Sequence, residues 1–338
     1  MTKSSTSRLT AAAHVAPLYV APMEGLTGFV YRRVHLEHFG GADAYWIPFV
    51  TPTVQPQFTE RQMRELAPAM NAGFRAVPQL LTRRAEDFIW AAKALADLGY
   101  DEVNLNVGCP AGTVVAKGKG SGFLRTPVEL EGFLSTIFEA DLPIAISVKT
   151  RIGYADEREF DLLSDVFNHF PMKALTIHPR LKTDMYKGDV RMHVFEDYWN
   201  RFDVPVGYNG DIVTCSDALR IHTQHPGLDH IMIGRALMAD PALLRKLRGG
   251  PAATLAEIQT FNDALLDAYD LAFGNRKNAI MRMKEYWFFL ANLFENSQKA
   301  VKAVFKSRTP EDYAAAIANI YDNHALLDTP GYGWRKPL

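Results

Sequence analysis

Residues 76–110 read AVPQLLTRRAEDFIWAAKALADLGYDEVNLNVGCP. Two short apolar runs, Ala76–Leu81 and Glu102–Val107, flank the stretch Arg84–Leu98, whose apolar residues recur with helical spacing on one side. A strand, a helix and a second strand in this order form a βαβ unit, in which the two strands pair in parallel. The segment therefore predicts an α/β protein with a parallel sheet.

The same alternation continues on both sides of this segment. Further strands are expected at Tyr19–Met23, Ala44–Val50, Ile144–Thr150, Ala174–His178, Val204–Asn209 and His230–Gly234. Further helices are expected at Val30–Phe39, Pro127–Glu139, Glu157–His169, Met192–Arg201, Ser216–His222 and Pro241–Arg248, whereas Thr51–Phe74 reads as a long loop with a short helix. Eight such units predict a (β/α)₈ TIM barrel. An open dinucleotide-binding sheet would carry Gly-x-Gly-x-x-Gly after its first strand, but this strand ends Ala-Pro-Met-Glu-Gly.

The strand pattern stops near Pro251. The remaining sequence predicts helices at Thr254–Phe273, Asn278–Phe294, Ser297–Phe305 and Pro310–Asp322, and hence an all-α helical bundle. We therefore expect three parts, namely a loose tail over 1–16, a catalytic barrel over 17–250 and a helical domain over 251–338.

Composition excludes several classes of protein. The chain has 338 residues and a formal net charge of -1, so a nucleic acid would have to be met by a local positive patch. Its two cysteines form neither a disulfide framework nor a zinc motif, which favours the cytoplasm and predicts no metal. No run of about 18 apolar residues predicts a membrane span, and the polar N-terminus does not read as a signal peptide.

Polar residues follow nearly every predicted strand, at the end where barrel enzymes carry their active sites. Cys109 lies on a turn between Gly108 and Pro110, which makes it the candidate catalytic residue, whereas Cys215 reads as a small helix residue. The other strand-end residues are Pro22, Met23, Glu24, Gln79, Asn106, Lys149, Arg151, His178, Arg180, Asn209, Gly210, Asp211, Gly234 and Arg235.

Glycine-rich turns follow the last two strands, at Asn209–Asp211 and Gly234–Arg235. Barrel enzymes commonly bind phosphate here, because glycine lets the backbone N–H groups approach the anion and an arginine adds a charged contact. A phosphorylated cofactor or substrate is therefore expected, with plain turns as the alternative.

Several motifs now resemble those of tRNA-dihydrouridine synthases, flavin enzymes that reduce uridine in RNA. They are Ala-Pro-Met-Glu-Gly at 21–25, Gln79, Asn-Val-Gly-Cys-Pro at 106–110, Lys-Gly-Lys-Gly-Ser-Gly at 117–122, Ser-Val-Lys-Thr-Arg at 147–151, His178 with Arg180, Asn-Gly-Asp at 209–211 and Ile-Gly-Arg-Ala at 233–236. The C-terminal helices are most similar to the bacterial branch acting on position 16 of the tRNA D-loop. Asn104 and Pro179 depart from the family, which usually has Asp and Gly there.

The resemblance implies roles for these residues. FMN would lie across the barrel mouth, with NADPH as its reductant. The flavin ring would meet Pro22, Met23, Glu24, Gln79 and Lys149, and its ribityl phosphate would meet Asn209, Gly210, Asp211, Gly234 and Arg235, with His178 between the two sets. Asn106, Arg151 and Arg180 would face the uracil. Cys109 would donate a proton to C5 while hydride reaches C6, since a free thiol with a pKa of about 8.5 is protonated near neutral pH.

Two basic segments suggest where RNA would bind. Lys117 and Lys119 lie in the glycine-rich loop Ala111–Thr126, which could close on a polyanion or remain without a partner. Lys299, Lys302 and Lys306 recur on one side of a predicted helix, within a segment that carries a net positive charge. The expected partner is tRNA and the expected state a monomer. The alternatives are ribosomal RNA, a small-molecule FMN dehydrogenase of the dihydroorotate or dihydropyrimidine type, and a non-catalytic RNA-binding protein.

Overall fold

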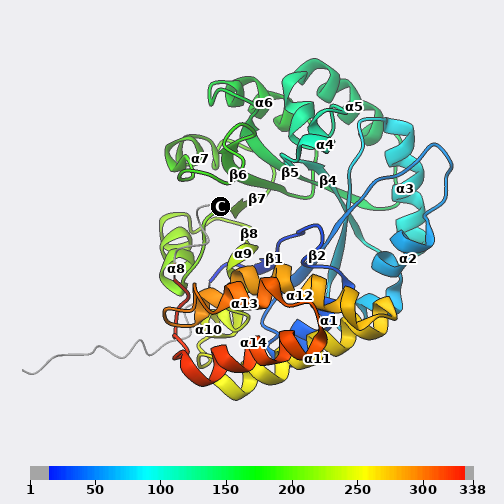
Figure 1. Ribbon diagram of the computed structural model, residues 1–338. Coiled ribbons are helices and arrows are strands. Elements are labelled where there is room, and N and C mark those ends of the chain that lie inside the picture. Colours follow the sequence, from blue (N-terminus) through cyan, green and yellow to red (C-terminus); the bar gives the residue numbers. More distant parts are fainter. Residues whose placement is uncertain (1–14, 332–338) are drawn as a thin grey trace, which may run out of the picture.

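Eight parallel strands close into a barrel in the computed structural model, which describes residues 15–331 (Figure 1). Each strand pairs with its neighbours in sequence, and β1 pairs with β8 to complete the wall. The strands are β1 Leu18–Val20, β2 Ala44–Val50, β3 Ala76–Leu80, β4 Glu102–Val107, β5 Ala145–Gly153, β6 Leu175–Leu181, β7 Val206–Asn209 and β8 His230–Ile233. This confirms the predicted TIM barrel.

Helices cover the outside of the barrel and continue beyond it as a bundle. The first group is α1 Phe29–His38, α2 Glu60–Leu66, η1 Pro68–Asn71, α3 Ala85–Asp97, α4 Gly112–Val115, η2 Gly120–Arg125, α5 Pro127–Glu139, α6 Glu159–Asn168, α7 Met192–Tyr198, α8 Cys215–Gln224, α9 Arg235–Ala239 and α10 Leu243–Leu247. The second group is α11 Leu255–Phe273, α12 Arg276–Leu290, η3 Ala291–Leu293, α13 Val301–Lys306 and α14 Pro310–Asn323. No helix within 15–331 is long and apolar enough to cross a membrane.

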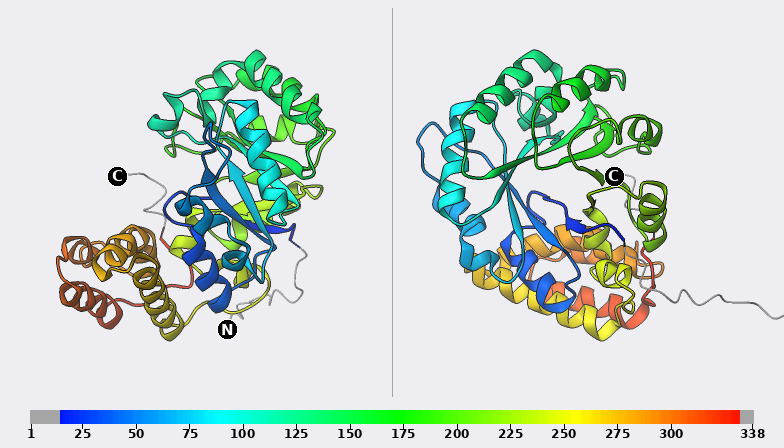
Figure 2. Two further views of the ribbon diagram at one scale, coloured as in Figure 1. Left: turned by 90° about the vertical axis from the view of Figure 1, so that its right-hand side faces the viewer. Right: turned by 180° about the vertical axis from the view of Figure 1, so that it is seen from behind.

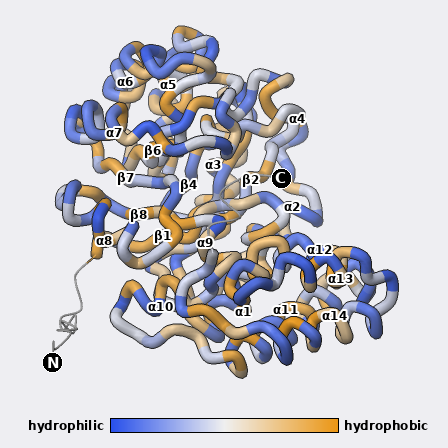
Figure 3. Tube along the Cα trace, turned by 60° about the vertical axis from the view of Figure 1, so that its left-hand side comes forward, coloured by the Kyte–Doolittle hydropathy of each residue, from blue (hydrophilic) through white to orange (hydrophobic). Residues whose placement is uncertain are grey.

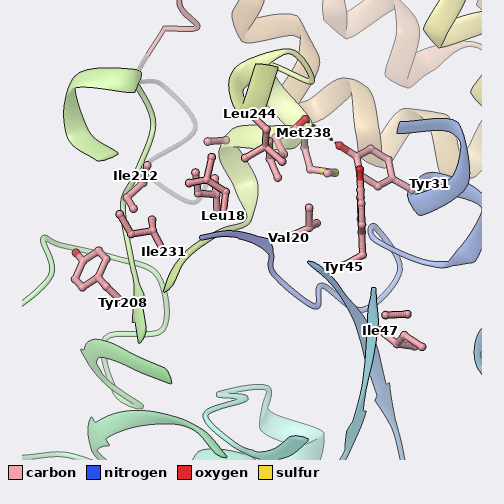
Figure 4. Packing of buried hydrophobic residues seen from close by; sticks show 14 of the residues in the cluster. Leu18, Val20, Tyr31, Tyr45, Ile47, Tyr208, Ile212, Ile231, Met238 and Leu244 are labelled. Atoms are coloured by element: carbon pink, nitrogen blue, oxygen red, sulfur yellow. Dashed lines mark hydrogen bonds between the residues drawn. The ribbon is translucent and has the colours of Figure 1, made fainter. Parts of the chain in front are cut away.

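Alternate residues of each strand face opposite sides of the wall. In β4, Val103, Leu105 and Val107 join the apolar layer under the helices, whereas Asn104 and Asn106 bond to side chains of neighbouring strands inside the barrel. Figure 4 shows the outer layer beside β1, where the Tyr31 hydroxyl also donates to the Leu237 carbonyl over 3.1 Å. The period of two therefore separates an apolar outer core from an interior that carries chemistry.

The barrel interior is filled with side chains. Trp46, Val77 and Met232 form its small apolar cluster together with Ala21 and Ala44. Gly207 is required where the wall approaches His230, because a Cβ there would lie 2.1 Å from the imidazole ring. A packed interior leaves the carboxyl-end mouth for ligands.

The C-terminal helices form a bundle that projects from one side of the barrel (Figure 2). The capping boxes at Thr254 and Thr309 start α11 and α14, and hydrophobic and hydrophilic turns alternate along both helices (Figure 3). The Phe261 ring of α11 packs edge-on against Tyr31 and Phe39 of the barrel. Since α12 packs against α9, which follows β8, the bundle lies beside the barrel mouth.

Three expectations differ from the structure. Residues 1–14 of the predicted tail lie outside the described residues, but Val15 and Ala16 are buried, and the Ala16 N–H donates to His222. The loop Ala111–Thr126 is partly helical through α4 and η2. Helix α13 begins at Val301, so Lys299 precedes it in a turn and the expected three-lysine helix face is wrong.

Candidate functional site

The strand-end residues gather at one rim because parallel strands share their carboxyl ends. Asn106 pairs in register with Lys149, and Arg151 pairs with His178. Strands β5 and β6 run further than expected, to Gly153 and Leu181, so Arg151 and Arg180 lie within strands instead of after them. Five of the predicted site residues thus come from three adjacent strands.

Asn106 holds the turn that carries Cys109. Its side-chain oxygen accepts the backbone N–H groups of Gly108 over 3.0 Å and of Cys109 over 2.8 Å. Asparagine favours such turns because its short side chain reaches the backbone two or three residues on. The predicted substrate residue Asn106 therefore has a direct structural task at the cysteine turn.

The segment after Cys109 folds back onto it. The Ser121 backbone N–H and hydroxyl both donate to the Cys109 carbonyl, over 3.0 and 2.9 Å. Gly120 has a φ of 55°, and a Cβ there would lie 2.7 Å from the same carbonyl oxygen. Lys117 is exposed and Lys119 is half-buried on this segment, so two of the predicted basic residues lie next to the thiol turn.

Burial and charge set the proton affinities at the mouth. Burial raises the pKa of the Cys109 thiol above its usual range, although the Ala111 backbone and the cations Arg151 and Lys149 oppose the rise. Burial, together with the neighbouring Arg151 cation, lowers the pKa of Lys149 to about 7. The thiol is therefore protonated near neutral pH, while the lysine titrates there.

Arg151 ties the cysteine turn to β6. It is 1% exposed, and its guanidinium donates to the Gly108 carbonyl over 2.9 Å and to the Leu181 carbonyl over 2.7 Å. The Tyr186 ring lies over the same group, 5.2 Å from ring centroid to guanidinium carbon. These contacts occupy much of the guanidinium, so contact between Arg151 and a substrate stays a prediction.

An ion-pair cluster joins the ends of β6, β7 and β8. Arg180 pairs with Asp211 through both terminal nitrogens and also donates to the Gly188 carbonyl over 2.7 Å. Arg235 pairs with the same carboxylate over 3.0 Å. The cluster leaves one positive charge in excess and holds Arg180 away from bulk water, at 1% exposed.

His178 is neutral in this setting. Burial and the cations Arg151 and Lys149 lower its pKa well below the usual range. Arginine can only donate, so the 3.1 Å contact from Arg180 makes Nε2 of His178 the acceptor. The proton of the neutral ring therefore sits on Nδ1, which makes this nitrogen a hydrogen-bond donor.

The ends of β7 and β8 suit a phosphate-bearing cofactor. Arg180 Nε is a buried donor without a hydrogen-bond partner in the described part of the chain. Gly234 lets the backbone pass Met23 closely, since a Cβ there would lie 3.2 Å from the Met23 sulfur. Asp211 would repel a phosphate, so its place between two arginines fits orientation of those cations better than direct contact. The residues thus fit an anionic group.

The remaining predicted cofactor residues lie on the same rim. The Asn209 amide donates to the Met232 carbonyl over 2.8 Å, and Gly210 has a φ of 153°. Pro22 and Met23 are half-buried after β1, and Gln79 is 1% exposed inside β3. Their contacts with a flavin stay predictions.

Glu24 faces a cleft of about 450 Å³ between the barrel and the bundle. Its side chain is 57% exposed, 3.9 Å from Arg61. Arg64 and Arg282 line the same cleft, and the Arg282 guanidinium packs so closely on Gly25 that a Cβ there would lie 2.6 Å away. Sequence reasoning missed Arg61 and Arg64, because the loop that precedes them carries no periodic signal.

The expected RNA-binding lysines of the bundle are exposed. Within residues 15–331, Lys299, Lys302 and Lys306 form no ion pair, whereas Arg276 of the same positive segment pairs with Asp267 and Asp270. Intramolecular pairing thus removes part of the positive charge that the sequence suggested and leaves these three lysines. Their role in RNA binding stays a prediction.

Sequence reasoning assigned no role to three further polar residues of the site. Asn104 and Ser147 lie two positions before Asn106 and Lys149 on the inward faces of β4 and β5. Tyr186 lies 5.1 Å from the Arg235 guanidinium as well as over Arg151. The period of two within the strands could have identified the first pair. Within the described residues no group of three His, Cys, Asp or Glu side chains could hold a metal.

Comparison with known proteins gives consistent matches. Residues 19–316 match the family model described as "Dihydrouridine synthase (Dus)". A protein named tRNA-dihydrouridine(16) synthase from Neisseria meningitidis is 28% identical over 320 residues, which cover 90% of this chain and 95% of that protein. One of the same name from Ralstonia nicotianae is 30% identical over 239 residues, which cover 69% and 72%. The tRNA-dihydrouridine synthase B of Pasteurella multocida is 28% identical over 229 residues, which cover 68% of each chain.

Solved structures resemble the fold more distantly. A histamine dehydrogenase from Rhizobium sp. 4-9 superposes with a TM-score of 0.51 and 13% identity, over 74% of this chain and 47% of that one. A 2-naphthoyl-CoA reductase superposes with a TM-score of 0.52 and 11% identity, over 69% and 50%. At these identities the likeness shows the fold alone.

Proposed function

The chain belongs to the dihydrouridine synthase family, and on this premise we propose that it reduces uridine in tRNA, with FMN as its flavin, NADPH as its reductant and Cys109 as its acid. Its reaction is the reduction of uridine to 5,6-dihydrouridine, which makes it a flavin-dependent oxidoreductase. The observation that carries the assignment of roles is the Cys109 turn, braced by Asn106 beside Lys149 at the barrel mouth.

Reduction of the uracil C5–C6 bond needs a hydride and a proton. When bound, the flavin supplies the hydride to C6. Cys109 donates its thiol proton to C5 and regains a proton from solvent, and its raised pKa keeps the acid form populated at neutral pH. Protonated Lys149 stabilises the negative charge that develops on the pyrimidine oxygens.

The cofactor roles follow the charges at the mouth. Arg180 and Arg235 supply the positive charge for the flavin phosphate, and Asp211 orients both. This role for Arg180 replaces the uracil contact expected from the resemblance, because Arg180 shares its carboxylate partner with Arg235. The Nδ1 hydrogen of neutral His178 serves as a donor to the flavin. Two further roles rest on the family resemblance alone, namely the ring contacts of Pro22, Met23 and Gln79 and the choice of NADPH.

The RNA follows the positive surface beside the mouth. The target base leaves its stack to reach the barrel mouth, while the backbone meets Arg61, Arg64 and Arg282 in the cleft and the lysines of α13 beyond it. Relatives named for position 16 and relatives named B match at similar identity, so the modified position stays a prediction, as do a monomer and a cytoplasmic location.

The decisive experiment is mass spectrometry of tRNA and ribosomal RNA from cells with and without the gene. Dihydrouridine should disappear at one mapped tRNA position and return with the wild-type gene or the Cys215→Ala variant. It should stay absent with Cys109→Ala. A loss confined to ribosomal RNA would replace the substrate, and unchanged RNA with turnover of a free pyrimidine would favour a small-molecule dehydrogenase.

A further inference from the structure

Four polar side chains inside the barrel form one continuous chain of hydrogen bonds, which we call the amide relay. Asn106 Nδ2 donates to Gln79 Oε1 over 2.7 Å, and Gln79 Nε2 donates to Asn104 Oδ1 over 2.8 Å. Asn104 Nδ2 then donates to the Ser147 hydroxyl oxygen over 3.0 Å. The relay thus joins β3, β4 and β5 beneath the cysteine turn.

The direction of the relay follows from the backbone of that turn. Backbone N–H groups can only donate, so the Gly108 and Cys109 amides require the oxygen of Asn106 to face them. The nitrogen of Asn106 must then face Gln79, which turns its own oxygen toward Asn106. Each amide in this way sets the orientation of the next, as far as Asn104 and Ser147. The assignment therefore does not depend on telling nitrogen from oxygen in any one amide.

All members of the relay are buried. Asn104 and Ser147 are 0% exposed, Gln79 is 1% exposed and Asn106 is 8% exposed. Water cannot replace a missing partner at the deeper positions, so removal of one member leaves the next with an unsatisfied polar group or turns it over. A change at Asn104, two residues below the rim, would therefore reach the cysteine turn through Gln79 and Asn106.

We propose that Asn104 and Ser147 are positioning residues for uracil reduction, because through Gln79 they hold the Asn106 side chain that braces the Cys109 turn. Neither residue reaches the strand end, and each acts only through its neighbours in the relay. The proposal rests on the function proposed above. It predicts that the relay affects delivery of the thiol proton far more than reduction of the flavin.

The test compares Asn104→Leu, Asn104→Asp and Thr176→Val in the flavin-loaded protein. Leucine keeps the branched shape of the Asn104 side chain, with a larger volume, and removes both hydrogen bonds. Aspartate keeps an acceptor for Gln79, and the Ser147 hydroxyl can turn to donate to it. Thr176→Val is the matched control, since it removes an equally buried hydrogen bond, from β6 to His230 of β8, that is not part of the relay.

Two measurements separate positioning from general loosening of the barrel. Hydrogen exchange followed by mass spectrometry should show the Gly108 and Cys109 amides exchanging at least about tenfold faster in Asn104→Leu than in Thr176→Val. Uridine reduction should fall about 10- to 100-fold in kcat, as for a small misplacement of a reacting group, with KM for RNA and the rate of flavin reduction by NADPH nearly unchanged. Asn104→Asp should return both readouts to within about threefold of wild type.

The proposal would be overturned if the Gly108 and Cys109 amides exchanged at the same rate in Asn104→Leu as in Thr176→Val. It would also be overturned if Asn104→Asp lost as much kcat as Asn104→Leu. If Asn104→Leu does not fold, Ser147→Ala takes its place in the comparison. The Gly108 and Cys109 amides should then exchange at least about threefold faster than in Thr176→Val. An exchange rate equal to that of Thr176→Val would count against the relay. Wild-type protein inactive on every RNA would refute the proposed function instead, and the exchange measurement would still decide whether the relay braces the turn.

Discussion

The two ends of the barrel interior are both polar, yet they are built differently. At the amino end, Glu102 accepts from Arg75 over 2.5 Å and lies 3.1 Å from Lys173. His230 there lies between Thr176, at 2.9 Å, and Asp229, at 2.8 Å. Each of these charged or polar groups has a partner of matching chemistry within its own cluster, which is the arrangement expected of structural polar groups.

The mouth at the carboxyl end has more cations than carboxylates. Lys149, Arg151, Arg180 and Arg235 lie at this end, where the half-buried Asp211 pairs with Arg180 and Arg235 and Glu24 turns to the cleft. The neighbouring Arg151 cation adds to burial, which is the main cause of the lowered pKa of Lys149. Polarity alone therefore does not identify the active end of this barrel, whereas incomplete compensation of charge does.

Replacement of Cys109 should have the largest effect at the mouth. We expect Cys109→Ala to lower the rate of uridine reduction about 10³-fold, since general acid catalysis by one group contributes about 10² to 10⁴. Flavin content and thermal stability should change little, because the side chain is small and the turn is held mainly by backbone groups that bond to Asn106 and Ser121. Single-turnover assays on a tRNA transcript measure the effect.

The matched control is Cys215→Ala, which removes the other half-buried thiol at the start of α8. Its turnover should equal that of wild type. If both variants retain full turnover, Cys109 is not the acid, and the thiol at the barrel mouth has no more effect on catalysis than the thiol of α8.

Most of the fold was predictable because strands and helices differ in period. The ranges of β2 and β4 agree with expectation at both ends. Strands β5 and β6 extend three residues further, since Arg151 and Arg180 find buried partners that no local pattern indicates. The error at α13 concerns where the helix begins. Residues 295–300 form turns, and because Ala300 is their one apolar residue, no apolar period marks the start of the helix.

The site was predictable as a set of strand-end residues but not as a network. Position after a strand led to Cys109, Lys149 and His178, which the barrel does bring to one rim. The relay through Asn104 depends on contacts between strands, which a single sequence does not report. The cleft beside Glu24 joins α2 to the bundle across a large separation in sequence, so it too required the fold.

The next test replaces one cation at each end of the barrel. Lys149→Met should lower uridine reduction about 10²-fold by removing a transition-state charge. It should also stabilise the protein by roughly 2 kcal/mol, because burial disfavours the charged ammonium in the folded protein. The gain is smaller than the full pKa shift implies, since the Lys149 side chain is only half-buried. Arg75→Met should have the opposite effects. It should destabilise the protein by roughly 2 kcal/mol, because Glu102 loses an ion-pair partner, and its turnover per folded molecule should be normal.

Thermal unfolding at several pH values checks the sign of the Lys149 effect. The pKa of Lys149 is about 7 in the folded protein and about 10.4 in an unfolded chain. Wild-type protein therefore gains stability as pH rises between these values, and the advantage of Lys149→Met should be greatest below pH 7 and shrink above it. An advantage that does not change with pH would mean that Lys149 is not held in an unfavourable charged state.

The pH dependence of turnover provides a smaller test of the mouth. If catalysis needs the Lys149 cation, activity is complete below pH 7 and declines as pH rises through about 7. We expect a loss of about tenfold one unit above that pKa, since the charged fraction falls by this factor per unit. The Cys109 thiol stays protonated over this range because its pKa is raised. Lys149→Arg should abolish the decline near pH 7, and a decline that persists in this variant would assign it to another group.

Charge reversal of the exposed bundle lysines tests whether the cations of the barrel mouth are sufficient for RNA binding. Lys302→Glu and Lys306→Glu change adjacent turns of α13, and Lys299→Glu changes the turn before it. Each should weaken tRNA binding about threefold at low salt and reduce the slope of log Kd against log salt by about one unit for each phosphate that the lysine neutralises. Lys93→Glu, at an exposed position of α3, makes the same charge change as a control. Equal affinity and equal salt slope for all four variants would mean that the cations of the mouth and cleft are sufficient, and the contrast between the two barrel ends would then explain RNA binding as well as chemistry.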